Sequence, residues 1–288
     1  MKKLILTVTV LALCSFSCAQ TPGAARVNTQ AEAGALLAQP GAVQGASHSR
    51  FSSADCAFTF TSGADNTFLK YCVTANGNIT VFESPAGQEH IAIGKDGEGY
   101  GLCDNTPEVA YNDYAEFGDS GNWGPATVLN QDAKSVTIAR TTSDGFWTLT
   151  QTFTQVAGKS PSVKIAMTLK NNTAVKRTAI LVRYADVDAA GVAENNLDGT
   201  LQSAFGWNSN TDMGSHPFGL VLQNVGTSQS PFFFGFVQDV PDGPPPCNVT
   251  VHQVQGPLTA TDGSIVMAYA IKVPAGKSKT VTVRYRGF

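Results

Sequence analysis

Long alternating segments in the middle of the chain restrict it to antiparallel β structure. In the first segment, Trp147, Leu149 and Phe153 alternate with threonines, and residues 162–170 and 177–187 keep the same two-residue period. Successive side chains of a strand point to opposite faces, so one face of each segment meets a core and the other meets water. The sequence therefore predicts an all-β fold, namely a large antiparallel β-sandwich.

Short apolar runs separated by Gly, Asn, Asp and Pro continue this pattern along the chain. Asn76-Gly77 and Asp262-Gly263 are tight-turn sequences, and 274–277 separates the last two runs as a hairpin loop. We expect one sandwich domain over 51–288, with two smaller sandwiches divided near 143–145 as the alternative. The predicted strands are 55–62, 67–74, 78–83, 89–93, 126–131, 134–142, 146–156, 162–170, 177–187, 218–224, 231–238, 248–254, 264–273 and 279–286.

The N-terminal segment reads as an export signal followed by a tether. Two lysines precede a short apolar run, and small residues follow it, so 1–19 is predicted to be a signal peptide. Cys18 gives an alternative, because lipoproteins are cleaved before a lipidated cysteine, but the residues before it fit simple secretion better. Residues 20–50 are rich in Ala, Gly and Gln and are expected to form a flexible tether. We therefore predict a secreted, periplasmic or extracellular protein.

Charge and hydropathy exclude two classes of partner. The formal net charge is -3, and removal of 1–19 takes away two lysines, which makes the remainder more acidic. Phosphate recognition needs clustered Lys and Arg, so a nucleic-acid partner is not expected. The N-terminal apolar run is too short to span a bilayer, and no later segment is apolar for long enough, so no membrane span is predicted.

The cysteines beyond the signal predict two disulfides. An even number of cysteines in an exported chain forms a disulfide framework, and four cysteines allow three connectivities. Cys56 and Cys72 flank a turn-rich segment between two strand-like runs, so a hairpin would bring them together. The preferred pairing is Cys56–Cys72 with Cys103–Cys247. No CxxC or histidine pattern suggests a metal or redox role.

The C-terminal segment resembles known proteins in its general strand pattern. Residues 262–286 form two alternating runs joined by Pro-Ala-Gly-Lys. This pattern resembles the closing hairpin of large secreted bacterial sandwiches, including the galactose-mutarotase-like supersandwich folds of carbohydrate-active proteins. The resemblance extends over this hairpin and the central strands. It implies a sandwich fold and a glycan-related role, and no catalytic residue can be carried over from it.

Aromatic residues in loop-like stretches are the candidates for ligand binding. Tyr111, Tyr114 and Trp123 lie in the densest mixture of aromatic and acidic residues, and Trp207 lies in a second such stretch. Their rings can stack on the C–H face of a sugar, while neighbouring carboxylates accept hydroxyl hydrogen bonds. The alternative is that these aromatics pack beneath a long loop.

An acidic loop after the third alternating segment is the candidate metal site. Asp186, Asp188 and Gly191 match the first, third and sixth positions of a calcium loop. The fifth and twelfth positions do not match, so Glu194 or Asp198 would have to replace the missing ligands. We predict Asp186, Asp188 and Asp198 as ligands of a structural Ca²⁺. A solvated acidic turn is the alternative.

Three functional hypotheses follow, in this order. The first is extracellular recognition of a polysaccharide or cell-surface glycan through loops at one end of the sandwich. The second is a polysaccharide lyase or glycoside hydrolase, for which Glu83, Glu89, Asp96, Glu98 and His90 are the candidate acids and base. The third is a structural or adhesive surface protein without a small ligand.

Overall fold

The structure is a computed structural model that describes residues 56–91, 97–114, 121–208, 217–226 and 232–288. The predicted signal peptide, the tether and Cys18 lie outside the described residues. Almost all of the described regular structure consists of strands, with short 3-10 turns η1 at Asp65–Thr67 and η3 at Ala189–Gly191. Within the described part, no helix is long and apolar enough to cross a membrane.

The strands form three sheets, and every registered strand pair is antiparallel. A three-stranded sheet has the order β1-β2-β3, with β1 at Phe58–Ser62, β2 at Leu69–Val73 and β3 at Ile79–Glu83. A six-stranded sheet has the order β15-β14-β17-β10-β4-β5. Its strands are β4 (Glu98–Asn105), β5 (Glu108–Tyr114), β10 (Arg177–Asp186), β14 (Phe232–Gln238), β15 (Gln253–Val254) and β17 (Ser264–Val273).

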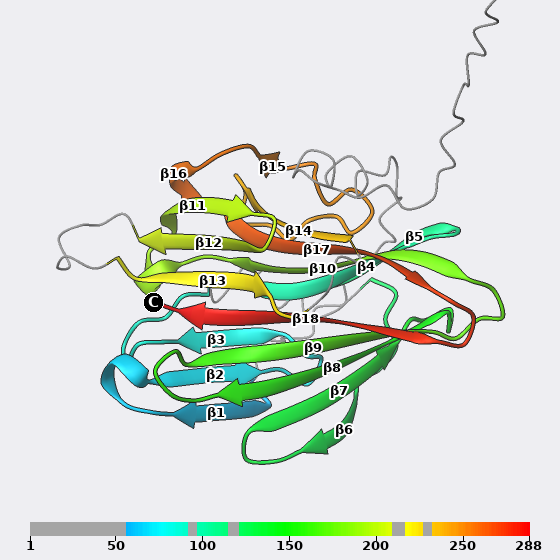
Figure 1. Cartoon of the computed structure of the whole chain (residues 1–288), viewed down its shortest axis with the longest axis horizontal. Coiled ribbons are helices and arrows are strands. Elements are labelled where there is room, and N and C mark those ends of the chain that lie inside the picture. Colours follow the sequence, from blue (N-terminus) through cyan, green and yellow to red (C-terminus); the bar gives the residue numbers. More distant parts are fainter. Residues whose placement is uncertain (1–55, 92–96, 115–120, 209–216, 227–231) are drawn as a thin grey trace, which may run out of the picture.

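The third sheet has nine strands and forms the largest layer of the molecule (Figure 1). Its order is β16-β11-β12-β13-β18-β9-β8-β7-β6. The strands are β6 (Thr127–Gln131), β7 (Ser135–Thr141), β8 (Trp147–Val156), β9 (Ser162–Asn171), β11 (Glu194–Thr200), β12 (Ser203–Asn208), β13 (Gly219–Asn224), β16 (Leu258–Asp262) and β18 (Ser278–Gly287).

The main core lies against the inner face of the nine-stranded sheet. Its central strands alternate as the sequence predicts: β8 buries Trp147, Leu149 and Phe153, and its threonines are only partly buried. One continuous apolar cluster joins this face to the other two sheets, and the Phe82 ring on β3 contacts the Tyr285 ring on β18. Each such large side chain contributes about 1.5–3 kcal/mol on burial. The all-β sandwich prediction is confirmed.

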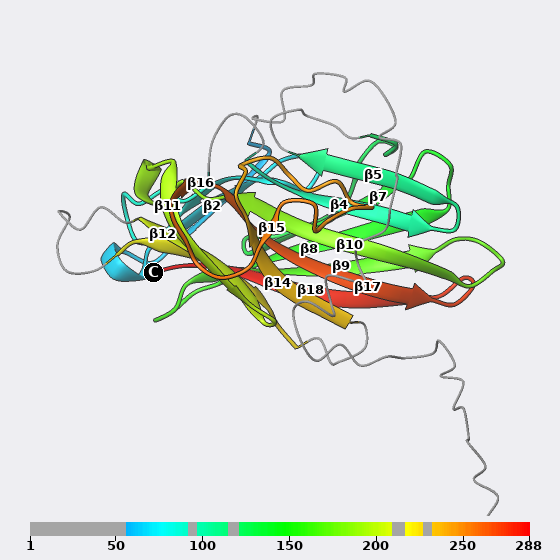
Figure 2. The ribbon, with the colours of Figure 1, turned by 90° about the horizontal axis from the view of Figure 1, so that it is seen from above.

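The six-stranded sheet is buried on both faces. Figure 2 shows β5, β4, β10 and β17 side by side in this sheet. Its second face carries a separate apolar cluster that includes Tyr184 and Phe236 and is covered by Val249 and Cys247 from the segment after β14. A strand buried on both faces needs no polar alternation, which explains the nearly continuous apolar run of β10.

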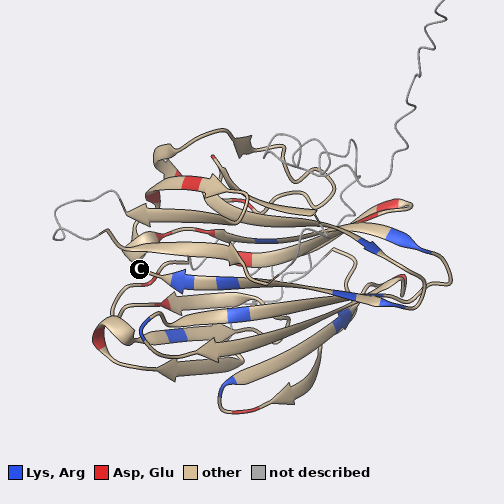
Figure 3. Ribbon diagram, in the orientation of Figure 1, with Lys and Arg blue, Asp and Glu red and all other residues tan. Residues whose placement is uncertain are grey.

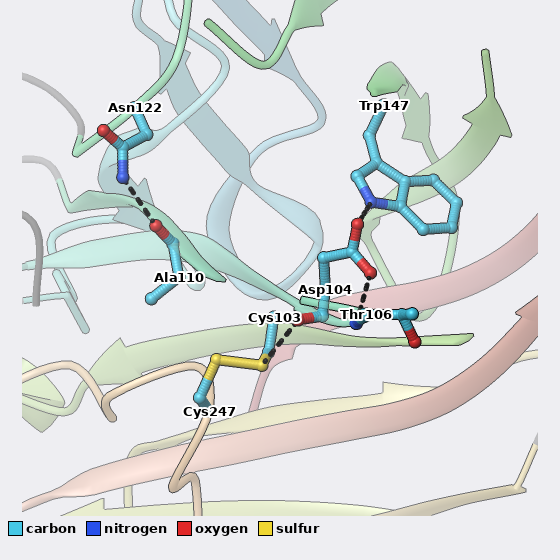
Figure 4. Close-up of a disulfide and its surroundings, with 7 residues drawn as sticks. All are labelled: Cys103, Asp104, Thr106, Ala110, Asn122, Trp147 and Cys247. Carbon is cyan, nitrogen blue, oxygen red and sulfur yellow. Dashed lines mark hydrogen bonds between the residues drawn. A yellow bond between two sulfur atoms is a disulfide. The ribbon is translucent and has the colours of Figure 1, made fainter. Parts of the chain in front are cut away.

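Both disulfides form in the predicted pairing. Cys56–Cys72 closes the β1–β2 hairpin with a Cα–Cα distance of 5.5 Å. Cys103–Cys247 joins β4 to the covering segment across 144 residues, with a Cα–Cα distance of 4.9 Å (Figure 4). The second bridge therefore fixes the cover of the six-stranded sheet to the middle of that sheet.

Two hairpins were missed by the sequence pattern. The stretch that contains Tyr111 and Tyr114 belongs to the β4–β5 hairpin, and the predicted loop after Asp186 contains the β11–β12 hairpin. Both are poor in β-branched residues and rich in Gly, Asn and Asp, so local propensity does not reveal them. Conversely, the described residues 89–91 of the predicted strand 89–93 form only isolated bridges, and 248–254 contains only the short β15. Strands from both sides of 143–145 share the same sheets.

Candidate functional site

Three of the four predicted ligand-binding aromatics are buried within the protein. The Tyr111 hydroxyl donates to Asp144 Oδ2 at 2.5 Å, and the Tyr114 hydroxyl donates to the carbonyl of Pro244. Trp123 is 7% exposed and packs between the rings of Tyr100 and Tyr111. These packed arrangements correspond to the alternative that the sequence left open. None of the three presents an open ring face to a ligand.

Trp207 lies instead on the outer face of the nine-stranded sheet. On β12, Ala204 and Gly206 point to the core, so Phe205 and Trp207 point away from it and are half-buried. Their ring centroids are 5.8 Å apart and their planes differ by 25°, which makes a stacked pair. Residues two apart on one strand share a face, so the strand itself sets this spacing.

A third aromatic residue extends this pair across the sheet. Gly219 on β13 lies opposite Trp207, and its backbone exchanges two hydrogen bonds of 3.0 Å with Phe288. A Cβ at Gly219 would come within 2.4 Å of the Phe288 ring, so the missing side chain leaves room for that ring on the outer face. Phe288 is 38% exposed. We call Phe205, Trp207 and Phe288 the aromatic strip.

Polar side chains border the aromatic strip on both sides. On β11, Asn196 lies opposite Trp207 and Asp198 lies opposite Phe205. On the other side, β18 carries Arg284 and Arg286 on the outer face, and Arg284 Nη2 donates to Gln223 Oε1 at 2.6 Å. Figure 3 shows these basic positions on β18 and acidic positions on β11. The strip therefore offers flat apolar rings with hydrogen-bonding groups beside them.

The predicted acidic loop forms a cluster with a different third member. Carboxylate oxygens of Asp186, Asp188 and Asp262 all lie within 4.8 Å of one another. Burial, followed by the charges of Asp188, Asp262 and Asp242, raises the pKa of Asp186 to about 8. Burial and Asp262 also raise the pKa of Asp188. Asp198 lies outside this cluster, on the outer face, where its Oδ1 accepts from the backbone of Gly199 at 2.7 Å.

The interior acids differ from this cluster because arginines face them. Glu98 and Arg183 are fully buried and form an ion pair, and Tyr285 and the backbone of Ile79 also donate to Glu98. Burial raises the pKa of Glu98 and the charge of Arg183 opposes that rise. Arg183 Nη1 also donates to Gln151 Oε1 at 2.5 Å.

Two further buried pairs repeat this arrangement. Asp113 pairs with Arg140 on β7. Asp104 pairs with Arg177 and accepts from Trp147 Nε1 at 2.8 Å and from the backbone of Thr106 at 2.9 Å (Figure 4).

The described residues that were predicted for acid–base chemistry each make contacts within the fold. Glu98 is in the ion pair described above, and Glu89 accepts from the backbone of Phe82 at 2.8 Å. His90 is buried, and desolvation lowers its pKa to about 4, so the ring is neutral at physiological pH. Its two ring nitrogens face the Ser84 carbonyl and the Ala190 amide. Glu83 contacts Lys70, and Asp96 lies outside the described residues.

Solved structures share this fold. No protein-family model and no curated protein matches the chain. A bacterial glucoamylase complexed with acarbose matches over 85% of this chain with a TM-score of 0.55 and 11% identity, and the chain spans 34% of that protein. A putative aldose 1-epimerase from Escherichia coli K12 matches over 80% of this chain and 99% of its own, with a TM-score of 0.46 and 13% identity. A galactose mutarotase-like protein from Lactobacillus casei matches over 80% of this chain and 100% of its own, with a TM-score of 0.47 and 10% identity. The resemblance to mutarotase-like sandwiches expected from the C-terminal hairpin is thus found among solved structures.

Some residues of the two candidate sites could be suspected from the sequence, and others could not. Phe205 has a local signal, because Phe-Gly-Trp places two aromatics two residues apart. Phe288 joins them only through the β13–β18 register. Asp262 was read as part of a tight turn, and only the fold places it beside Asp186.

Proposed function

We propose that the protein is an exported carbohydrate-binding protein that holds a glycan on the aromatic strip. The observation that carries this proposal is the stacked Phe205–Trp207 pair on the outer face of the sheet, continued by Phe288 across Gly219. The outward-facing positions of an antiparallel sheet are usually polar, so aromatic side chains gathered on that face suggest a binding role.

The chemistry of the strip matches that of a sugar chain. Aromatic faces bury the C–H side of a pyranose, which removes apolar area from water. Asn196 and Asp198 on β11 and Arg286 on β18 lie beside the rings and can exchange hydrogen bonds with hydroxyl groups. A strip of rings on the outer face of a sheet favours a chain that lies across the strands rather than a small enclosed molecule.

Binding is favoured over catalysis by the surroundings of the acids. The candidate acid Glu98 and the interior Asp104 and Asp113 each face an arginine. A hydrolase needs two carboxyl groups that converge on one bond in an accessible cleft. We therefore keep the enzyme hypothesis second and the structural or adhesive alternative third.

A polysaccharide panel tests the proposal. The secreted protein is incubated with insoluble and soluble glycans, including α-glucans because the glucoamylase of similar fold was crystallised with acarbose. Both retention and released sugar are measured. We expect at least one glycan to be retained without product release, and Trp207→Ala to weaken binding about tenfold, or ~1.4 kcal/mol.

Leu129→Ala is the matched control, because Leu129 is 58% exposed on β6 at the far end of the same sheet. The control should bind as the wild type does, and both variants should keep the wild-type melting temperature within a few degrees. Retention by Trp207→Ala at wild-type affinity would contradict the proposed site. Failure of the whole panel would favour the structural alternative, and product release would favour the enzyme.

A further inference from the structure

Three carboxylates meet at one end of the six-stranded sheet from segments far apart in sequence. Asp186 is the last residue of β10, Asp188 follows it just before η3, and Asp262 ends the edge strand β16. Their oxygens lie within 4.8 Å of one another. Glu194 lies directly opposite Asp262 in the β11–β16 register and adds a further negative charge. Like charges at such positions destabilise a sheet unless something neutralises them.

Asp186 makes this cluster different from an ordinary acidic surface. The residue is 4% exposed, and its buried Oδ1 has no hydrogen-bond partner among the described residues. Across the part of the chain that the structure describes, no ion pair with Lys, Arg or His reaches any of the three cluster acids. An isolated buried carboxylate is strongly unfavourable, so proteins pair it, protonate it or give it a metal. The carboxylate of Asp186 lies beside two further acids, and one bound cation would neutralise all three together.

A second buried oxygen on the same face also has no partner. Ser264 on β17 lies opposite Asp186 on one side and opposite Gln238 on the other. Residues paired in this way share a sheet face, so Gln238 and Asp186 point to the same side, two strands apart. Gln238 is fully buried and its Oε1 accepts no hydrogen bond from the described residues, while its Nε2 donates to the carbonyl of Asp242 at 3.1 Å.

We propose that Asp186, Asp188 and Asp262 are ligands of one Ca²⁺ ion. Calcium takes carboxylate oxygens at about 2.3–2.6 Å, so oxygens on opposite sides of the ion lie about 5 Å apart, and the observed grouping can surround it. Mg²⁺ is smaller and usually keeps several waters with only one or two carboxylates. The ligand set contains neither His nor Cys, which disfavours zinc.

The ion would hold the edge strand of the largest sheet to the centre of the six-stranded sheet. β16 pairs with β11 through a short register interrupted by an irregularity between Asn195 and Leu197. Asp262 is exposed at the end of this strand, whereas Asp186 is fixed between β17 and the backbone of Gly97. A shared cation therefore links a weakly paired edge to a fixed point.

Calcium titration tests the proposal without any glycan, so it can fail independently of the proposed function. The purified secreted protein is stripped with EDTA, then titrated calorimetrically with CaCl₂ and with MgCl₂ at constant ionic strength, and its thermal unfolding is followed in parallel. We expect Ca²⁺ to bind with a dissociation constant of ~1 mM or tighter, as in extracellular modules, and to raise the melting temperature.

Two matched substitutions separate the structural ligand set from the one the sequence suggested. Asp262→Asn removes an exposed cluster member without disturbing the core, and it should abolish both the heat of binding and the thermal shift. Asp198→Asn makes the same chemical change on the neighbouring strand β11 and should leave both intact. Asp186→Asn should behave as Asp262→Asn does.

The outcomes that overturn the proposal are definite. No binding heat and no thermal shift with Ca²⁺ would remove the site. Mg²⁺ binding as tight as Ca²⁺ binding would overturn the assignment to calcium. Wild-type binding in Asp262→Asn, or loss of binding in Asp198→Asn, would overturn this set of ligands.

Discussion

Two groups of acids in this molecule, each with buried members, differ in what faces them. In the interior, Glu98, Asp113 and Asp104 each lie against an arginine and accept further hydrogen bonds. At the end of the six-stranded sheet, Asp186 is also buried, but among the described residues the charges nearest to it are those of Asp188, Asp262 and Asp242. The interior acids carry their counter-charge within the fold. The cluster does not, which is why we assign it an external partner.

The comparison also distinguishes acids that form ion pairs within the fold from acids that we assign to a ligand site. The pair of Glu98 with Arg183 joins β4 and β10 to Tyr285 on β18, and so ties the two large sheets together. Buried pairs of this kind add little net stability over apolar residues, but they are costly to break because one charge is then left alone. The three cluster acids are not neutralised in this way, so substitutions in the two groups should have opposite effects on stability.

Breaking the ion pair of Glu98 with Arg183 should have the largest effect on the free energy of unfolding. Arg183→Met leaves the Glu98 carboxylate buried with no cation, and we expect a loss of about 3–5 kcal/mol in the free energy of unfolding, measured by urea denaturation. Adding Glu98→Gln to this variant should recover part of the loss, because the neutral amide needs no counter-charge. Equal stability of Arg183→Met and the wild type would show that the interior network is not what distinguishes the two groups.

Removing one hydrogen bond to an interior acid should have a smaller effect. Trp147→Phe deletes the 2.8 Å hydrogen bond from Nε1 to Asp104. Asp104 still pairs with Arg177 and still accepts from the backbone amide of Thr106. We expect a loss of about 2–3 kcal/mol, from the bond to a charged group and the smaller ring together.

The matched control is Trp123→Phe, since the Trp123 Nε1 is buried and has no hydrogen-bond partner in the part of the chain that the structure describes. This variant makes the same chemical change but breaks no such bond, so it should be clearly less destabilising than Trp147→Phe. Equal losses in the two variants would mean that ring volume alone, and not the bond to Asp104, sets the cost.

The sequence predicts the frame of the fold better than its sites, for physical reasons. The alternation in β8 and β9 is visible in the sequence because one face of each strand is buried and the other is more exposed to solvent. The first disulfide could be predicted because its two cysteines are close along the chain. Strand β4 reads Glu-Gly-Tyr-Gly-Leu-Cys-Asp-Asn and is buried on both faces, so it has no alternation to detect.

The sites depend on contacts between distant segments. Asp186 and Asp188 are close in sequence and were both candidates there, but Asp262 reaches them only because β17 pairs with β10. In the same way, Trp207 was identifiable as a candidate, whereas its neighbour across the sheet, Phe288, depends on the register of β13 and β18. A short local pattern can suggest the chemistry of a site but cannot complete its set of residues.

Replacing Asp186, which has no arginine beside it in the described part of the chain, should have the smallest effect on the free energy of unfolding. The change should be a gain in stability rather than a loss. In EDTA, Asp186→Asn removes the cost of a buried carboxylate, and we expect a gain of about 1–2 kcal/mol at pH 8, measured by urea denaturation. Because the pKa of Asp186 is raised to about 8 in the folded protein, the wild type loses stability from this group as the pH rises from about 4 to about 8. The advantage of the variant should therefore grow over that range. A variant less stable than the wild type at pH 8 in EDTA would mean that the Asp186 carboxylate is already satisfied within the fold, and the contrast between the two groups of acids would not hold.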